Sequence, residues 1–114
     1  MNIPKLTITR TSNGSGTEIV HLEGPLVMGT TAEFQQTLRS ETAPKVVLDF
    51  TGTPYIDSAG LGALIAIQVH FKQVKRALVL AGINEKCRAL LKMTNVEGLF
   101  PSYATVEDAK KALA

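Results

Sequence analysis

Two short runs of the chain are almost continuously hydrophobic, residues 46–50 (VVLDF) and residues 77–81 (ALVLA). Runs of this length without polar alternation are typical of strands that are covered on both faces of a sheet. The segment between them, from residue 58 to about residue 74, has the length and composition of a helix. This strand–helix–strand unit predicts two parallel strands joined by a right-handed crossover.

The N-terminal part of the chain has the alternating pattern of a hairpin. Residues 5–11 place Leu6 and Ile8 on one face, and residues 17–23 read as a second strand. The turn sequence SNGSG at 12–16 separates the two segments. Glycine and asparagine between two such segments favour a tight reversal, so we expect antiparallel pairing.

Three positions predict the beginnings of the remaining helices. Thr30 and Glu33 have the spacing of a capping box, in which Thr30 accepts from the third helical amide and Glu33 bonds back to the Thr30 amide. That helix is expected to reach about residue 39. Asn84 is expected to cap a helix through about residue 94, and Thr105 a last helix to the end of the sequence. With a short strand near 99–103, the expected order is ββαβαβαβα.

Composition limits the classes of function. Hydrophobic residues make up 45% and charged residues 19%, which fits one globular α/β domain over residues 1–114. The formal net charge is only +2 and the basic residues are scattered, so we expect no nucleic-acid partner. The single cysteine, Cys87, permits no intramolecular disulfide and indicates a buried apolar role in a reducing compartment. The longest apolar run, residues 59–67, is far shorter than the ~20 residues of a membrane span, and no signal peptide is evident. A cytoplasmic protein is expected.

The candidate chemistry lies in residues 56–67, IDSAGLGALIAI. This stretch follows the first buried strand and opens the long helix, a region where open α/β sheets tend to place functional sites. Asp57 is suited to be the N-cap, with its carboxylate accepting from the amide of Ala59 or Gly60, which leaves Ser58 in the first turn. A negative group on Ser58 would lie near the positive end of the helix dipole, so the fold is expected to tolerate a phosphate there.

The sequence lacks the motifs of several enzyme classes that could use this serine or the neighbouring aspartate. Ile56 occupies the first glycine position of a Gly-x-Ser-x-Gly elbow, and the sequence offers only His21 and His70 as a base. Because His21 is expected in a strand and His70 far along a helix, neither a triad nor a metal site is expected. The sequence also has no phosphate-binding Gly-x-x-x-x-Gly-Lys loop. A receiver domain would need an acidic pair after its first strand to hold Mg²⁺ beside Asp57, and that pair is missing from the sequence. We expect no enzymatic activity, no cofactor and no metal.

The sequence Asp57-Ser58-Ala59-Gly60-Leu61-Gly62 resembles the motif of STAS domains, especially of bacterial anti-sigma-factor antagonists. The segments VVLDF at 46–50, LAGIN at 80–84, LLKM at 90–93, LFP at 99–101 and VEDA at 106–109 fit the same family. The resemblance covers roughly residues 17–113. It implies a STAS-type α/β fold, with a central mixed sheet of an N-terminal hairpin plus parallel strands, packed with about four helices.

The resemblance also implies a function. In this family, the serine after the motif's aspartate is phosphorylated by a partner that is both a serine kinase and an anti-sigma factor, which makes Ser58 the expected phosphoacceptor. The chain is then expected to be an anti-sigma-factor antagonist that holds this partner while Ser58 is unmodified and so regulates transcription. A phosphatase is a further expected partner. The expected partner-binding surface is the motif itself, namely Asp57, Ser58, Ala59, Gly60, Leu61 and Gly62.

One departure from the family lies at the entry to the first helix. Many members have Gly-Glu-Leu-Asp there, whereas this chain has Gly24-Pro25-Leu26-Val27, so Val27 replaces an acid that helps to engage the kinase. The alternative function is therefore a STAS scaffold subunit of a larger assembly, such as a lipid-transport or signalling complex, in which Ser58 only begins a helix. Secondary acceptor candidates, each also explained as a turn or cap residue, are Thr31, Thr51 and Thr53.

The surroundings of Ser58 determine what a phosphate would do. No Lys or Arg occurs from residue 46 to residue 71, so a phosphate of about −1.5 to −2 charges would point outward and repel a docked partner. Gly60 and Gly62 either keep the helix start low for a partner's approach or let the helix pack on the sheet. The helix carries more apolar residues than one buried face needs, so they either divide between core and partner or all serve the core. They are Leu61, Leu64, Ile65, Ile67, Val69 and Phe71.

Overall fold

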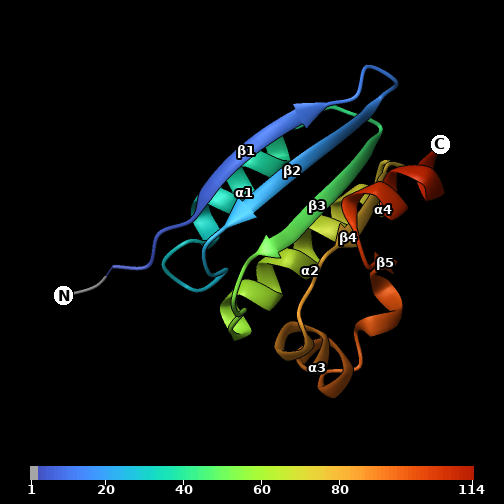
Figure 1. The fold of residues 1–114 in the computed structure, drawn as a ribbon. Coiled ribbons are helices and arrows are strands. Elements are labelled where there is room, and N and C mark those ends of the chain that lie inside the picture. The colour runs from blue at the N-terminus through green and yellow to red at the C-terminus, as the bar shows by residue number, and fades with distance from the viewer. Residues whose placement is uncertain (1–2) are drawn as a thin grey trace.

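The computed structural model describes residues 3–114 and has the element order predicted above, with one short 3-10 helix added (Figure 1). The elements are β1 Thr7–Ser12, β2 Thr17–Glu23, α1 Thr31–Ser40, β3 Lys45–Gly52, α2 Ser58–Gln73, β4 Ala77–Ala81, α3 Glu85–Met93, the 3-10 helix η1 Glu97–Leu99, β5 Ser102–Tyr103 and α4 Val106–Leu113. Within residues 3–114, no helix is long and apolar enough to cross a membrane.

The strands form one five-stranded sheet whose spatial order, β1-β2-β3-β4-β5, is also the order along the chain. Strand β1 pairs antiparallel with β2, and every later neighbour is parallel, with β2 beside β3, β3 beside β4 and β4 beside β5. The predicted combination of an N-terminal hairpin and parallel strands is therefore confirmed. The two almost continuously apolar runs, in β3 and β4, lie in the interior of the sheet.

The sheet separates two hydrophobic clusters of unequal size. The larger lies on the face covered by α1 and α2, and it contains Phe34, Leu48, Leu64 and Phe71 among its fully buried side chains. The smaller lies on the other face, where Ala109 of α4 packs against the outward residues of the three central strands (Figure 1). Because α4 is short, it covers β3, β4 and Ile19 of β2 on this face, and it leaves β1 and the last residue of β2, Glu23, exposed.

Two of the predicted helix caps are confirmed. The Asn84 carboxamide oxygen accepts from the amide of Cys87 (2.8 Å), and the Thr105 hydroxyl accepts from the amide of Asp108 (3.1 Å). Cys87 is buried, as expected, and its burial raises the pKa of the thiol. A protonated, inaccessible thiol is a poor nucleophile, so Cys87 has a packing role.

The predicted capping box at the start of α1 is wrong. Thr30 occupies the N-cap position, but its hydroxyl makes no hydrogen bond to a helical amide. The hydroxyl instead accepts from the amide of Val27 (3.0 Å) and lies 2.9 Å from the carbonyl oxygen of Pro25. The Thr30 amide donates to the carbonyl of Val27 (2.8 Å), so it is not available to Glu33. The hydroxyl and the amide of Thr30, which the capping box would need, are both hydrogen-bonded within the tight turn of residues 25–30.

The short strand expected at 99–103 is confirmed only in its last part. Leu99 ends the 3-10 helix η1, and β5 is limited to the two residues after Pro101, which pair with Leu80 and Ala81. Proline has no N–H to donate to a ladder, so Pro101 contributes only its carbonyl, which accepts from the amide of Leu80 (2.9 Å). The N-terminal half of β4 is left without a neighbouring strand on this side.

Candidate partner-binding site

Ser58 is the first residue of α2, where the chain turns back after the carboxyl end of β3. Its side chain is exposed. The loop before it, residues 53–57, is held from two sides: the Thr53 hydroxyl donates to Leu22 O (3.2 Å), and the Asn84 amide nitrogen donates to Pro54 O (2.9 Å). An exposed hydroxyl is therefore displayed from a fixed position rather than from a mobile loop.

Asp57 is the N-cap of α2, as predicted. One carboxylate oxygen accepts from the amide of Gly60 (2.7 Å), and the other accepts from the amide of Met28 in the loop before α1 (3.1 Å). The backbones of the two loops are also paired, since Asp57 N donates to Leu26 O (3.2 Å) and Leu26 N to Tyr55 O (3.2 Å). Asp57 thus fixes Met28 beside the start of α2.

The motif residues after Ser58 divide into supporting and displayed positions. Gly60 and Leu61 are buried, and a Cβ on Gly60 would overlap the carbonyl oxygen of Leu26. In the free chain both residues lie behind the surface and support it, and the partner contact expected of them stays a prediction. Ala59 is half-buried, and Gly62 is exposed with no atom within 4 Å of where its Cβ would be. Of the two roles expected for the glycines, Gly60 lets the helix pack closely on the loop at Leu26, whereas Gly62 leaves the outer side of the helix open to a partner's approach.

The rest of α2 is mostly a core helix. Of the six apolar side chains left open by the sequence, only Val69 is exposed (42%) and Ile65 is half-buried against the core. The others are buried in the larger cluster; they are Leu61, Leu64, Ile67 and Phe71.

An uncharged strip nevertheless remains along the outer side of α2. Ser58, Gly62, Ala66 and Val69 are exposed at spacings of three and four residues, which places them on one side of the helix. Met28, 77% exposed and fixed beside Asp57, extends this strip at the Ser58 end. We call these five residues the Ser58 surface. Its only polar side chain is that of Ser58.

The Ser58 surface has no cation of its own. The ion pairs found within residues 3–114 join Arg10 to Glu41, His21 to Asp49 and Lys110 to Glu107, and none involves residues 56–62. The absence of Lys and Arg from 46 to 71 gives the same result along the sequence.

The secondary acceptor candidates have local partners. Thr53 is 2% exposed. The Thr51 hydroxyl donates to an Asp49 carboxylate oxygen (2.6 Å), and the Thr31 hydroxyl donates to Met28 O (3.2 Å). These contacts agree with the turn or cap roles predicted for the three threonines from the sequence.

Comparison with known proteins now decides the family. The sequence model of one family, the STAS domain, matches residues 9–109, which is most of the chain. This chain belongs to the STAS domain family.

Solved structures agree on the fold of this STAS domain. An anti-sigma factor antagonist from Mycobacterium paratuberculosis is similar with a TM-score of 0.84 at 22% identity, covering 95% of this chain and 93% of that one. The Bacillus cell fate determinant SpoIIAA, in its phosphorylated form, gives 0.74 at 14% identity, over 95% and 100% of the two chains. A sulfate transporter family protein from Wolinella succinogenes gives 0.76 at 23%, over 87% and 85%. The expected STAS-type α/β fold is confirmed.

A polar row on the open face of this STAS domain was not foreseen from the sequence. The Thr11 hydroxyl lies 3.1 Å from His21 Nε2, His21 Nδ1 lies 2.7 Å from an Asp49 carboxylate oxygen, and the other Asp49 oxygen accepts from Thr51. The row crosses β1, β2 and β3. Strand pairing could have indicated part of it, because His21 lies directly opposite Asp49 in the parallel ladder.

The order of groups in this row, hydroxyl–imidazole–carboxylate, is that of a catalytic triad, but its setting is different. Side chains stand out from the sheet face while the amides of β1, β2 and β3 point along it, so these strands supply no oxyanion hole beside the Thr11 hydroxyl. The row instead joins three strands by side-chain hydrogen bonds. Burial alone would raise the pKa of Asp49, but the hydrogen bonds from Thr51 and His21 outweigh burial and hold that pKa below its ordinary value.

The lowered pKa makes a testable contribution to stability. Ionised Asp49 stabilises the folded state fully at pH values above the pKa of Asp in the unfolded chain. This contribution is lost as the pH falls through the lower pKa that Asp49 has in the folded state. We expect Asp49→Asn to reduce the free energy of unfolding by about 1 kcal/mol near pH 7 and by much less near pH 3, measured by urea denaturation. Glu23→Gln, an exposed acid on the same face, is the control and should change little at either pH. An equal loss for Asp49→Asn at both pH values would contradict the role given to its charge.

Proposed function

We propose that this STAS domain is an anti-sigma-factor antagonist and acts by binding, not by catalysis. It holds a protein that is both anti-sigma factor and serine kinase while Ser58 is unmodified, and it releases that protein once Ser58 is phosphorylated. The observation that carries the proposal is the exposed Ser58 hydroxyl at the first residue of α2, at one end of an uncharged surface.

The charge balance of the Ser58 surface supports a switch that works by repulsion. A phosphoserine carries about −1.5 to −2 charges near neutral pH. At the first residue of a helix it would meet free backbone amides and the positive end of the dipole, so the free domain keeps its fold. None of the five residues of the Ser58 surface is basic, so a partner docked there would have to bury that charge without a cation from this surface, which disfavours the complex.

The replacement of the family's acid by Val27 changes the expected contact without removing it. Val27 is 7% exposed, and its backbone groups are bound to Thr30, so its side chain does not reach a partner. Its neighbour Met28 is exposed and lies against Asp57. We therefore expect an apolar contact through Met28 where other members offer a carboxylate.

Val27 also favours the second candidate, a scaffold subunit in a larger assembly. The fold similarity to a sulfate transporter family protein shows that the same architecture occurs in a protein with that family name. In a scaffold, Ser58 would serve only to start α2, and an added charge there would leave the assembly intact.

Capture of partners from a lysate of the protein's own host separates the two candidates. Immobilised wild type, Ser58→Ala and Ser58→Asp are compared, with Ser15→Asp as a control that adds the same charge in the exposed β1–β2 turn. We expect a serine kinase to be retained by wild type, Ser58→Ala and Ser15→Asp and lost by Ser58→Asp. Retention of that kinase by Ser58→Asp would count against the switch. A stoichiometric transporter ATPase held by all four baits would favour the scaffold.

A further inference from the structure

Strand β1 is an open edge of the sheet along its whole length. It lies at one end of the strand order, and among residues 3–114 its only strand partner is β2 (Figure 1). The pairing of Thr7–Ser12 with β2 has no shift in register. Native proteins commonly protect such edges with proline, lysine or a bulge, because a free row of backbone groups can pair with another strand. β1 has none of these devices.

The hydrogen-bond pattern of the hairpin shows which backbone groups of β1 are free. The Asn13 amide donates to Thr17 O (3.2 Å) across the hairpin, so this opposed pair points inward. Opposed pairs in an antiparallel ladder alternate between bonded and non-bonded pairs. The odd-numbered residues of β1 therefore bond to β2. The N–H and C=O groups that point outward are those of the even-numbered residues, Ile8, Arg10 and Ser12.

The side chains of β1 bring no unpaired charge to this edge. Arg10 is its only ionisable residue, and its guanidinium is held at the end of α1, 3.4 Å from Glu41 Oε2 and 3.3 Å from Ser40 Oγ. On the open face, the Thr11 hydroxyl lies 3.1 Å from His21 Nε2, which anchors the strand to its neighbour. A regular, anchored strand without unpaired charge can act as a template for a further strand.

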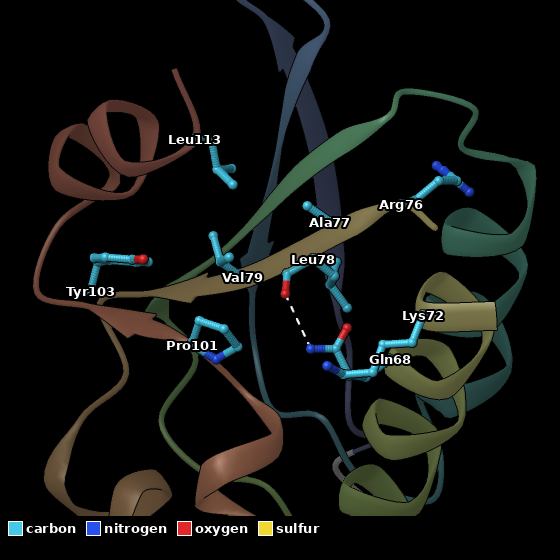
Figure 2. Close-up of a pocket in the computed structure, with 9 residues that line it drawn as sticks. All are labelled: Gln68, Lys72, Arg76, Ala77, Leu78, Val79, Pro101, Tyr103 and Leu113. Carbon is cyan, nitrogen blue, oxygen red and sulfur yellow. Dashed lines mark hydrogen bonds between the residues drawn. The ribbon is translucent and has the colours of Figure 1, made fainter. Parts of the chain in front are cut away.

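The opposite end of the sheet offers no comparable edge. β5 has only two residues, Ser102–Tyr103, and it covers only the last part of β4. In the uncovered part, Leu78 O accepts from the amide nitrogen of the buried Gln68 (3.2 Å; Figure 2). An acceptor that an added strand would need is therefore already used, so strand addition is favoured at β1.

We propose that β1 pairs with β1 of a second copy of this chain, antiparallel and about a two-fold axis through Thr9, so that the two sheets become continuous. In this register, Ile8 lies opposite Arg10 of the second copy, and each such pair exchanges both of its N–H···O bonds. A contact of this kind uses the same surface on both copies and closes at a dimer. The proposal does not depend on the function proposed for Ser58.

A second copy matches this edge in both side-chain shape and charge. Each threonine of β1 meets another threonine, Thr9 with itself and Thr7 with Thr11, and such cross-strand pairs are favourable. The aliphatic stem of Arg10 covers the half-buried Ile8 of the second copy while the guanidinium keeps its ion pair. No unpaired charge enters the junction.

The neighbouring registers are less favourable. An axis one residue later would place Arg10 opposite its own copy, and like charges directly opposite are destabilising. An axis one residue earlier would place Pro4 opposite Ser12, and proline has no N–H to donate. The axis through Thr9 pairs residues 6–12 with one another and leaves no proline in the ladder.

Sedimentation equilibrium and amide hydrogen exchange of the full chain, over a range of protein concentrations, test this dimer. Two short strands make a small interface, so we expect a weak dimer with a dissociation constant on the order of 0.1 mM. The amides of Ile8 and Arg10 should exchange more slowly as the protein concentration rises. The amide of Leu78, at the other edge of the sheet, should exchange at a rate that does not depend on concentration.

Thr9→Lys and Thr9→Glu are a matched pair of variants, because Thr9 is exposed and each change places two like charges opposite each other on the axis. We expect each variant alone to dimerise about fivefold more weakly than wild type, and an equimolar mixture to recover the wild-type affinity to within about twofold. Thr94→Lys, which adds a charge at an exposed position just after α3, is the control and should dimerise like wild type.

The proposal is overturned if wild type stays monomeric at the highest concentration, if either Thr9 variant alone dimerises like wild type, or if mixing the two variants restores nothing. Slower exchange at Ile8 and Arg10 only after another protein is added would assign this edge to a different partner and would also overturn it.

Discussion

Replacing Gly60 with alanine is expected to lower the free energy of unfolding by about 3 kcal/mol, because the new methyl group would overlap the carbonyl oxygen of Leu26. That carbonyl accepts from the Asp57 amide, so any shift that relieves the overlap also disturbs the link between the two loops at the site. For a chain of this size, the melting temperature should fall by about 12 °C. Urea and thermal denaturation measure both quantities.

Gly62→Ala is the matched control, since it makes the same change two residues later in the same helix. No atom lies within 4 Å of the position that its Cβ would take. Alanine is the better helix former, so this variant should be more stable than wild type by about 0.5–1 kcal/mol. The propensity gain is common to both variants, so their difference measures the contact with Leu26. Equal stabilities would show that the contact is looser than the structure describes.

Phosphorylation of Ser58 is expected to weaken the proposed complex with an anti-sigma-factor kinase about a thousandfold. Burying a dianion on a surface whose own residues carry no cation costs about 4 kcal/mol, and each 1.4 kcal/mol is a tenfold change in the dissociation constant. Calorimetric titration of the captured partner with wild type and with phosphoserine at position 58 gives the ratio directly. Phosphoserine at position 15, in the exposed hairpin turn, controls for net charge and should change affinity little.

The melting temperature of the same phosphoprotein shows whether the phosphate acts by repelling the partner or by changing the structure of the domain. Because the modified residue is exposed at a helix N-terminus, its melting temperature should remain within a few degrees of the unmodified value. A large change in melting temperature would mean that the charge reorganises the domain. A loss of affinity below tenfold would mean that the partner supplies its own cation at this position.

Much of the fold could be predicted because its signals are local. Strands β3 and β4 contain almost continuous apolar runs, and the caps at Asp57, Asn84 and Thr105 depend on residues at most three positions away. The position of Ser58 at the start of α2 follows from the same local rules. Short-range patterns of this kind are readable in one sequence.

The parts that failed depend on contacts between distant segments. Thr30 has the correct spacing for a capping box, but its hydroxyl and its amide are both hydrogen-bonded to the backbone of Val27. The burial of Gly60 follows from the approach of Leu26, which lies more than thirty residues earlier in the sequence. Likewise, the row from Thr11 to Asp49 needs the register of three strands.

Site-resolved mass spectrometry tests the identity of the acceptor most directly. The protein is incubated with its captured kinase partner and ATP, and the phosphorylated residue is mapped beside that of protein isolated from its own host. One phosphoryl group on Ser58 in both samples, and none on Ser58→Ala, is the outcome predicted here. Phosphate on Thr31, Thr51 or Thr53 instead, or an unmodified Ser58 after incubation with an active kinase, would contradict the account.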